Sequence, residues 1–200
     1  AIAMLTGVFC YYQNNKIVIT NIKLKQKTNN KVRIAQISDL HSKEFGKNNY
    51  ILYKKIIEQK PDIIVATGDL IDSSMKKLDE IIEFCSSINK DIPMYYILGN
   101  NEMRCSRVSE IVEKLKKNKI CVLENEIESI EVKGNKINIL GLAEKRIDEG
   151  ELFYSKVNSR YGTENIEKIF SRLERLDGIK IVLSHYPENF EYVEEGAYSK

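Results

Sequence analysis

The sequence predicts an α/β fold in which helices cover a largely parallel sheet. Three observations support this class. Between residues 32 and 118, short apolar segments alternate with amphipathic segments of helical period. After residue 118 the pattern changes to short strands joined by tight turns, which indicates a second, more antiparallel sheet. With 42% hydrophobic residues, the 200-residue chain can bury one sizeable core, so we expect a single folded domain.

The first half of the chain supplies the alternation of strands and helices. Apolar and polar residues alternate approximately in 17–25 and turn-forming residues follow at 28–31, so we expect a hairpin with the next strand. Further along, the expected strands lie at 32–38, 62–67 and 93–98, and the expected helices at about 49–59, 74–88 and 106–118. Such alternation is typical of βαβ units.

The second half supplies the other sheet. The segments ICVLE, IESIEV and KINILGLA read as short strands, with a turn at Gly134-Asn135. Residues 144–162 are charged and lack a period, so we expect a surface loop. A helix follows at 163–176, with Thr163 as its N-cap, and IKIVLSHYPENF then forms a strand and a loop. No repeat or interdomain linker interrupts the chain.

Composition excludes some classes of function. The 31 basic and 29 acidic residues nearly cancel, so the chain lacks the positive surface of a general nucleic-acid binder, and no specific nucleic-acid binding is expected. The cysteines form no CxxC pair and have no metal-ligand spacing, which favours buried or free thiols over a disulfide framework. They are Cys10, Cys85, Cys105 and Cys121.

The apolar start of the chain, AIAMLTGVFCYY, predicts the end of an N-terminal membrane anchor in residues 1–14. A membrane-spanning helix needs about 20 apolar residues, and about a dozen precede an aromatic pair typical of a membrane interface. The alternative is an apolar terminal strand or core helix. We therefore expect a membrane-associated protein, with a cytoplasmic one as the alternative. The basic residues that follow favour an inward flank, but the side of the membrane is left open.

Four of the expected strands end in a short polar phrase. In open α/β sheets, side chains converge at the carboxyl ends of the strands, and sites form there. A single Asp or Asn after a strand is usually a turn former, but four such phrases at equivalent positions indicate a site. The phrases are Ser38-Asp39-Leu40-His41, Gly68-Asp69, Gly99-Asn100-Asn101-Glu102 and Ser184-His185.

These residue types suit a divalent-cation site. The chain has two histidines, His41 and His185, and both follow an expected strand. Because Asp39 and His41 are two apart, an extended backbone would direct both to one side and Leu40 into the core. Carboxylate, imidazole and amide ligands favour Mn, Fe, Zn or Mg. Two such ions need a bridging carboxylate, for which Asp69 is the candidate, and Gly68 would allow close backbone approach.

The segments "IAQISDLHS", "IIVATGDLID", "YYILGNNE" and "IVLSHYPE" resemble, in order, the first four motifs of the calcineurin-like metallophosphoesterase family. The resemblance covers residues 32 to about 190 and implies a four-layer αββα sandwich of two mixed sheets in residues 15–200. It also implies two divalent metal ions. Asp39 and His41 would hold the first ion, Asp69 would bridge, and Asn100 with His185 would hold the second. The apolar N-terminus is similar to that of a bacterial, membrane-anchored subgroup.

Two positions depart from the family pattern. The family's third motif usually has a histidine, a general acid, where this chain has Asn101, which can donate a hydrogen bond but not deliver a proton. Some family members that cleave pyrophosphate bonds also lack this histidine. The family's fifth motif, Gly-His-x-His, does not occur between His185 and Lys200. We therefore expect a fragment, truncated at the C-terminus, whose own metal binding and activity are impaired.

The resemblance implies a dinuclear hydrolase of phosphoester or pyrophosphate bonds, with a metal-bridging hydroxide as nucleophile. The expected substrate is a phosphorylated small molecule or lipid. One alternative is a noncatalytic, membrane-tethered binding or scaffold domain that retains the phosphoesterase fold. A second is a Cys-His hydrolase that uses Cys105. Arg104, Arg107 and Glu102 are not included in the predicted site, and the sequence does not predict an oligomeric state.

Overall fold

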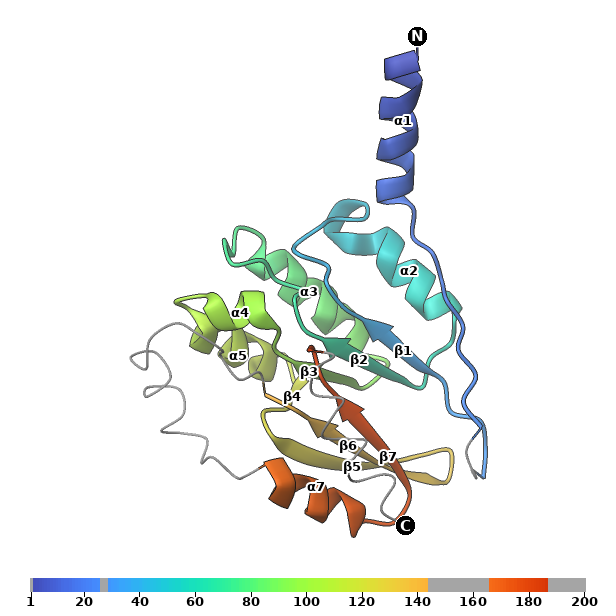
Figure 1. Ribbon diagram of the computed structural model, residues 1–200, viewed down its shortest axis with the longest axis vertical. Coiled ribbons are helices and arrows are strands. Elements are labelled where there is room, and N and C mark those ends of the chain that lie inside the picture. The colour runs from blue at the N-terminus through green and yellow to red at the C-terminus, as the bar shows by residue number, and fades with distance from the viewer. Residues whose placement is uncertain (1, 26–28, 144–165, 187–200) are drawn as a thin grey trace.

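The computed structural model describes residues 2–25, 29–143 and 166–186, and within them the chain forms two sheets (Figure 1). Sheet A has the order β1-β2-β3-β4 and is parallel throughout. Its strands are β1 (Ile34–Ile37), β2 (Ile63–Thr67), β3 (Met94–Ile97) and β4 (Cys121–Val122). Sheet B is mixed, because β5 (Glu126–Val132) pairs antiparallel and β7 (Ile179–Leu183) parallel with the central β6 (Asn135–Gly141). The predicted α/β class is confirmed.

The helices lie on the outer faces of the sheets. After β1 come a short 3-10 helix, η1 (Lys47–Asn49), and α2 (Tyr50–Glu58), and after β2 comes α3 (Leu78–Asn89). The segment after β3 forms α4 (Asn100–Arg104) and α5 (Val108–Lys117), and α7 (Ile166–Glu174) precedes β7. Between residues 32 and 143 the predicted strands and helices are therefore present with boundaries shifted by a few residues, except that α4 was not expected.

Alternating residues of sheet A separate two hydrophobic layers. Ile64, Ala66 and Tyr96 pack in one cluster with the buried faces of α2, α3 and α5. Their neighbours Ile63 and Val65 face the opposite way, into a cluster that includes residues of sheet B. A third cluster joins the far side of sheet B to α7. Helices, sheet A, sheet B and α7 thus form the expected four-layer sandwich.

The predicted hairpin at 17–25 is wrong. Residues 16–25 have no regular secondary structure, and apolar side chains in this segment, such as Ile22, are exposed. The asparagines that suggested a hairpin turn serve another contact: Asn29 N–H donates to Asn135 Oδ1 at 2.8 Å, and Asn135 Nδ2 donates to the Asn30 carbonyl at 2.9 Å. The turn residues therefore fasten the segment before β1 to the β5–β6 turn, while β1 pairs with β2.

The apolar N-terminus is the helix α1 (Ile2–Asn15), which projects from the two sheets in Figure 1. Its large apolar side chains from Met4 to Tyr12 are exposed. Among the described residues, no helix combines the length and apolar character needed to cross a membrane. The predicted loop at 144–162, the N-cap Thr163 and the end of the fourth motif fall outside the described residues.

Candidate active site

The polar phrases after β1, β2, β3 and β7 meet at one edge of the sandwich. Ligand-capable atoms of Asp39, Asp69 and His185 all lie within 4.8 Å of one another. His41 joins them, because its Nε2 atom lies 3.6 Å from Asp39 Oδ1 and 3.9 Å from Asp69 Oδ2. Asn100 completes the group through its contact with His185. The structure therefore brings together all five residues that the sequence singled out as ligands.

The backbone that presents Asp39 and His41 is not extended, contrary to expectation. Both residues have left-handed φ angles, 54° and 47°. The loop is held in this form by its neighbour, since Asp39 N–H donates to the Gly68 carbonyl at 3.1 Å and His41 N–H to the Asp69 carbonyl at 2.9 Å. Leu40 is buried between them, as predicted. The two side chains therefore meet because two loops pair beyond the strand ends, not because of strand alternation.

Asp69 lies at the centre of the group and is only 2% exposed. Its φ angle of 55° is also left-handed. The Asn101 backbone N–H donates to Asp69 Oδ1 at 2.8 Å, and the Asn101 side-chain Nδ2 donates to Oδ2. Asn101 thus directs its amide at the Asp69 carboxylate. These bonds fix the orientation of the carboxylate between the two histidines.

His185 and Asn100 make the most informative contact. His185 Nδ1 donates to the Thr67 carbonyl at 2.8 Å, so in the neutral imidazole Nε2 carries a lone pair. That lone pair faces the carbonyl oxygen of the Asn100 side chain at 3.1 Å. Two acceptors at this distance repel each other unless a proton on Nε2 or a metal cation lies between them. Adjacent ligands of an octahedral ion, with bonds of about 2.1 Å, lie about 3.0 Å apart, so the pair fits a divalent cation.

Two glycines allow the loops to approach this closely. Gly68 has a φ angle of +88°, and a Cβ there would lie 2.6 Å from the Gly99 Cα and 2.8 Å from His185 Nδ1. A Cβ on Gly99 would collide with the Asp69 carboxylate. The sequence predicted that Gly68 would make room near the site. In the structure this room is filled by Gly99 and His185, which bring the β2, β3 and β7 ends together.

Glu102 was left out of the predicted site, yet it lies directly beneath it. The side chain is fully buried, and its carboxylate accepts hydrogen bonds from three backbone N–H groups and the Tyr96 hydroxyl. Burial raises the pKa of Glu102, and hydrogen bonds from the Ile71 N–H, the Tyr96 hydroxyl and the Asp69 N–H oppose the rise. A sequence signal existed: Glu102 stands three residues after Gly99, where a carboxylate can cap a helix N-terminus.

Two other candidates are not at the site. Arg107 is exposed and pairs with Glu110, with 2.6 Å between Arg107 Nε and Glu110 Oε2. Cys105 is buried beside Met75 in the cluster between sheet A and its helices. A catalytic thiol must be accessible to its substrate, so the Cys-His hydrolase hypothesis has no support from this geometry.

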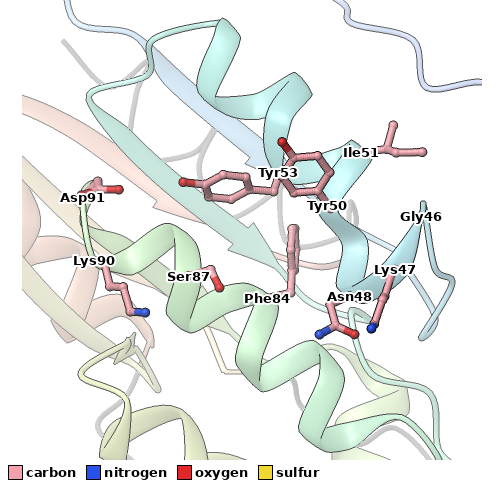
Figure 2. Close-up of a pocket in the computed structure, with 10 residues that line it drawn as sticks. All are labelled: Gly46, Lys47, Asn48, Tyr50, Ile51, Tyr53, Phe84, Ser87, Lys90 and Asp91. Atoms are coloured by element: carbon pink, nitrogen blue, oxygen red, sulfur yellow. The ribbon is translucent and has the colours of Figure 1, made fainter.

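A hollow of about 750 Å³ lies elsewhere, between α2 and α3 (Figure 2). Tyr50 and Tyr53 of α2 and Phe84 and Ser87 of α3 are among its lining residues. None of the five candidate ligands lines it. The hollow is therefore large but lacks the cluster of carboxylates and histidines found at the strand ends. The strand ends are the better candidate for an active site.

Comparison with known proteins agrees with this geometry. Residues 32–199 match the family model described as calcineurin-like phosphoesterase. The chain is 32% identical over 108 residues to an uncharacterized metallophosphoesterase of Aquifex aeolicus, covering 50% of this chain and 41% of that protein. It is 33% identical over 102 residues to an uncharacterized metallophosphoesterase of Campylobacter jejuni, covering 47% and 26% of the two chains. The chain thus spans less than half the length of these relatives.

Among solved structures, a candidate 5′-nucleotidase from Staphylococcus aureus, in complex with alpha-ketoglutarate, superposes with a TM-score of 0.53 at 16% identity. The match covers 76% of this chain and 37% of that one. At this identity the likeness concerns the fold, and it agrees with the two-sheet sandwich. Because the family model matches most of the chain, and because the four motifs converge at one site, the chain belongs to the calcineurin-like phosphoesterase family.

Proposed function

We propose that this protein is a dinuclear metal-dependent hydrolase of phosphoester or pyrophosphate bonds. The observation that carries the proposal is the convergence of five ligand-type side chains from four strand ends, in which His185 Nε2 and Asn100 Oδ1 face each other as two acceptors. Family membership supports the same class of chemistry. The noncatalytic scaffold is the alternative, and a test of turnover separates the two.

The side chains divide into two overlapping sets. Asp39 and His41 would hold one divalent ion (Mn, Fe, Zn or Mg), Asn100 and His185 a second, and Asp69 lies between the two sets. When bound, such ions lower the pKa of a coordinated water and neutralise charge on a phosphoryl group. The protein keeps the His185 tautomer fixed through Thr67, so that Nε2 is free to act as a ligand.

The proposal also concerns which leaving groups the protein accepts. Asn101 has no proton to give near neutral pH, and its amide is already bonded to the Asp69 carboxylate. We expect the protein to favour substrates whose leaving group needs little protonation, such as a pyrophosphate. A phosphorylated small molecule is the proposed substrate class, and a lipid pyrophosphate is a member of it that a membrane-associated enzyme could reach.

Membrane association through residues 1–14 is proposed on two further observations. Large apolar side chains of α1 are exposed, and the chain contains six basic residues and no acidic residue before Asp39. Flotation with liposomes tests this proposal. Recovery of the protein with the vesicles, lost when residues 1–14 are deleted, would support it, and unchanged recovery without those residues would refute it.

Turnover is tested by Mn²⁺-dependent hydrolysis of bis-p-nitrophenyl phosphate. Asp69→Asn keeps the size of the side chain but removes its charge, and it should abolish both hydrolysis and Mn²⁺ binding. Asp91→Asn is the matched control, because Asp91 is exposed at the hollow between α2 and α3. Metal binding without hydrolysis of any phosphoester or pyrophosphate would favour the scaffold alternative, and hydrolysis that survives in Asp69→Asn would contradict the site.

A further inference from the structure

We infer that Glu102 is a positioning residue that locks the loops after β2 and β3 together and thereby sets the affinity of the site for metal. This inference rests on the proposed function, because it concerns the same site. Glu102 touches neither the substrate nor the candidate ligand atoms. It acts through the backbone of the loops that carry Asp69 and Asn100.

The geometry is that of a clamp with two ends. Glu102 Oε2 accepts from the backbone N–H of Asp69 at 2.9 Å and of Gly99 at 3.0 Å. Oε1 accepts from the backbone N–H of Ile71 at 3.0 Å and from the Tyr96 hydroxyl at 2.8 Å. One carboxylate therefore holds two residues of the β2 loop and the residue that immediately precedes Asn100.

Only a carboxylate fits this position. Three of the four partners are backbone N–H groups, which can only donate, and the side chain is 0% exposed, so no water replaces a lost acceptor. A glutamine would place an NH₂ group against at least one of the backbone N–H donors, which leaves that buried N–H without an acceptor, even if the Tyr96 hydroxyl turns to accept from the NH₂ group. The partners are also neutral, so Glu102 brings a buried negative charge close to a cluster proposed to bind cations.

A simple helix cap does not account for these contacts. The bond to Gly99 N–H is the capping contact of α4, which has only five residues. The bonds to Asp69 and Ile71 reach the other loop, 33 and 31 residues away in the sequence. Asp69 also has a left-handed φ angle, a conformation that costs energy unless its surroundings hold it. The hydrogen bond from the Asp69 N–H to Glu102 stabilises this backbone conformation.

The test compares Glu102→Gln with the unchanged protein by calorimetric titration of the metal-free protein with Mn²⁺. The dissociation constant should rise about 10- to 100-fold, the range found when outer partners of metal ligands are removed. Raising the Mn²⁺ concentration should restore much of the hydrolysis. Glu58→Gln is the matched control, since Glu58 ends α2 and is exposed. Circular dichroism of the metal-free proteins monitors the fold.

The outcomes separate the inference from the proposed function. If the unchanged protein binds no Mn²⁺, the proposed function fails first. If it binds Mn²⁺ and Glu102→Gln binds equally well, Glu102 has no positioning role, and a lower thermal stability alone would not rescue it. Should Glu102→Gln fail to fold, Tyr96→Phe decides, because it removes one donor and keeps the carboxylate. A several-fold weaker affinity in Tyr96→Phe supports the clamp, and an unchanged affinity overturns it.

Discussion

His185 Nε2 lies 3.1 Å from Asn100 Oδ1, and both atoms are acceptors when His185 Nδ1 donates to Thr67. With a neutral imidazole, the two lone pairs repel each other in the metal-free protein, and both atoms can coordinate a cation that binds between them. The relationship also distinguishes a metal site from an ordinary hydrogen-bonded core, in which a donor would face an acceptor. It therefore leads to a prediction about stability that does not depend on turnover.

Asn100→Leu should reduce the stabilisation by Mn²⁺, because it removes a ligand of one of the two proposed ions, without destabilising the metal-free protein. Leucine has the same branched arrangement of side-chain heavy atoms as asparagine, although its methyl groups are bulkier, and it removes the repelling oxygen. In the unchanged protein, Mn²⁺ at 100 times its dissociation constant should add about 2.7 kcal/mol to the free energy of unfolding. Thermal unfolding with and without Mn²⁺ measures both effects. A lower melting temperature for metal-free Asn100→Leu, with the Mn²⁺ effect intact, would mean that His185 donates to Asn100 instead.

Gly68→Ala should lower both stability and metal affinity. The new Cβ would lie 2.6 Å from the Gly99 Cα, and the φ angle of +88° is unfavourable for alanine, so the β2 and β3 loops must move apart. We expect a loss of about 2–4 kcal/mol in the free energy of unfolding, the range of steric and backbone-strain substitutions. Denaturant titration measures it. Gly7→Ala is the control, because nothing lies within 4 Å of a Cβ there.

The sequence predicted the layers well because each layer has its own periodicity. In β2, all five residues from Ile63 to Thr67 are buried, since helices cover one face and sheet B the other. The hairpin prediction for residues 17–25 was wrong for a related reason. Its alternation is real, but alternation alone does not name a partner, and among the described residues β1 pairs with β2 while no strand lies along its other edge.

At the site, the sequence predicted the residues but not the way they are held. The positions of Asp39 and Asp69 after predicted strands were enough to place them at the site, because the carboxyl ends of parallel strands lie at the same edge of the sheet. The left-handed backbone at both residues could not be predicted, since it depends on hydrogen bonds between loops distant in the sequence. Glu102 was missed because its four donors come from three segments, and a carboxylate after Asn101 looks locally like an exposed or capping residue.

Asn101→Ala should weaken metal binding, because it removes the side-chain bond to the Asp69 carboxylate while the backbone N–H bond stays. We expect about a 10-fold loss of Mn²⁺ affinity. Asn101→His should retain activity on substrates with good leaving groups and gain most on alkyl phosphates, which need protonation. Rates for a series of leaving groups of increasing pKa measure the effect. An equal change for every leaving group would show that position 101 takes no part in leaving-group protonation.

The Asp62–Lys133 pair should make stability fall in acid. Partial burial pushes the pKa of Asp62 up, but hydrogen bonds from the Lys133 ammonium and the Arg33 N–H outweigh burial and lower it below 3.8. Because the folded-state pKa is depressed, the stabilisation is present above the unfolded-state value and is lost as pH falls through the folded-state value.

Asp62→Asn should therefore cost about 0.5–1 kcal/mol at pH 7, a modest figure because the Lys133 side chain is 52% exposed and solvent screens the pair. The difference between Asp62→Asn and the unchanged protein should shrink as pH falls from about 4 through the lower folded-state pKa, below which Asp62 is protonated in both states. Urea unfolding at a series of pH values checks this, with Lys133→Met and the double variant completing a mutant cycle. A difference that persists undiminished at pH 2 would assign the stabilisation to the hydrogen bond from Arg33 N–H and not to charge.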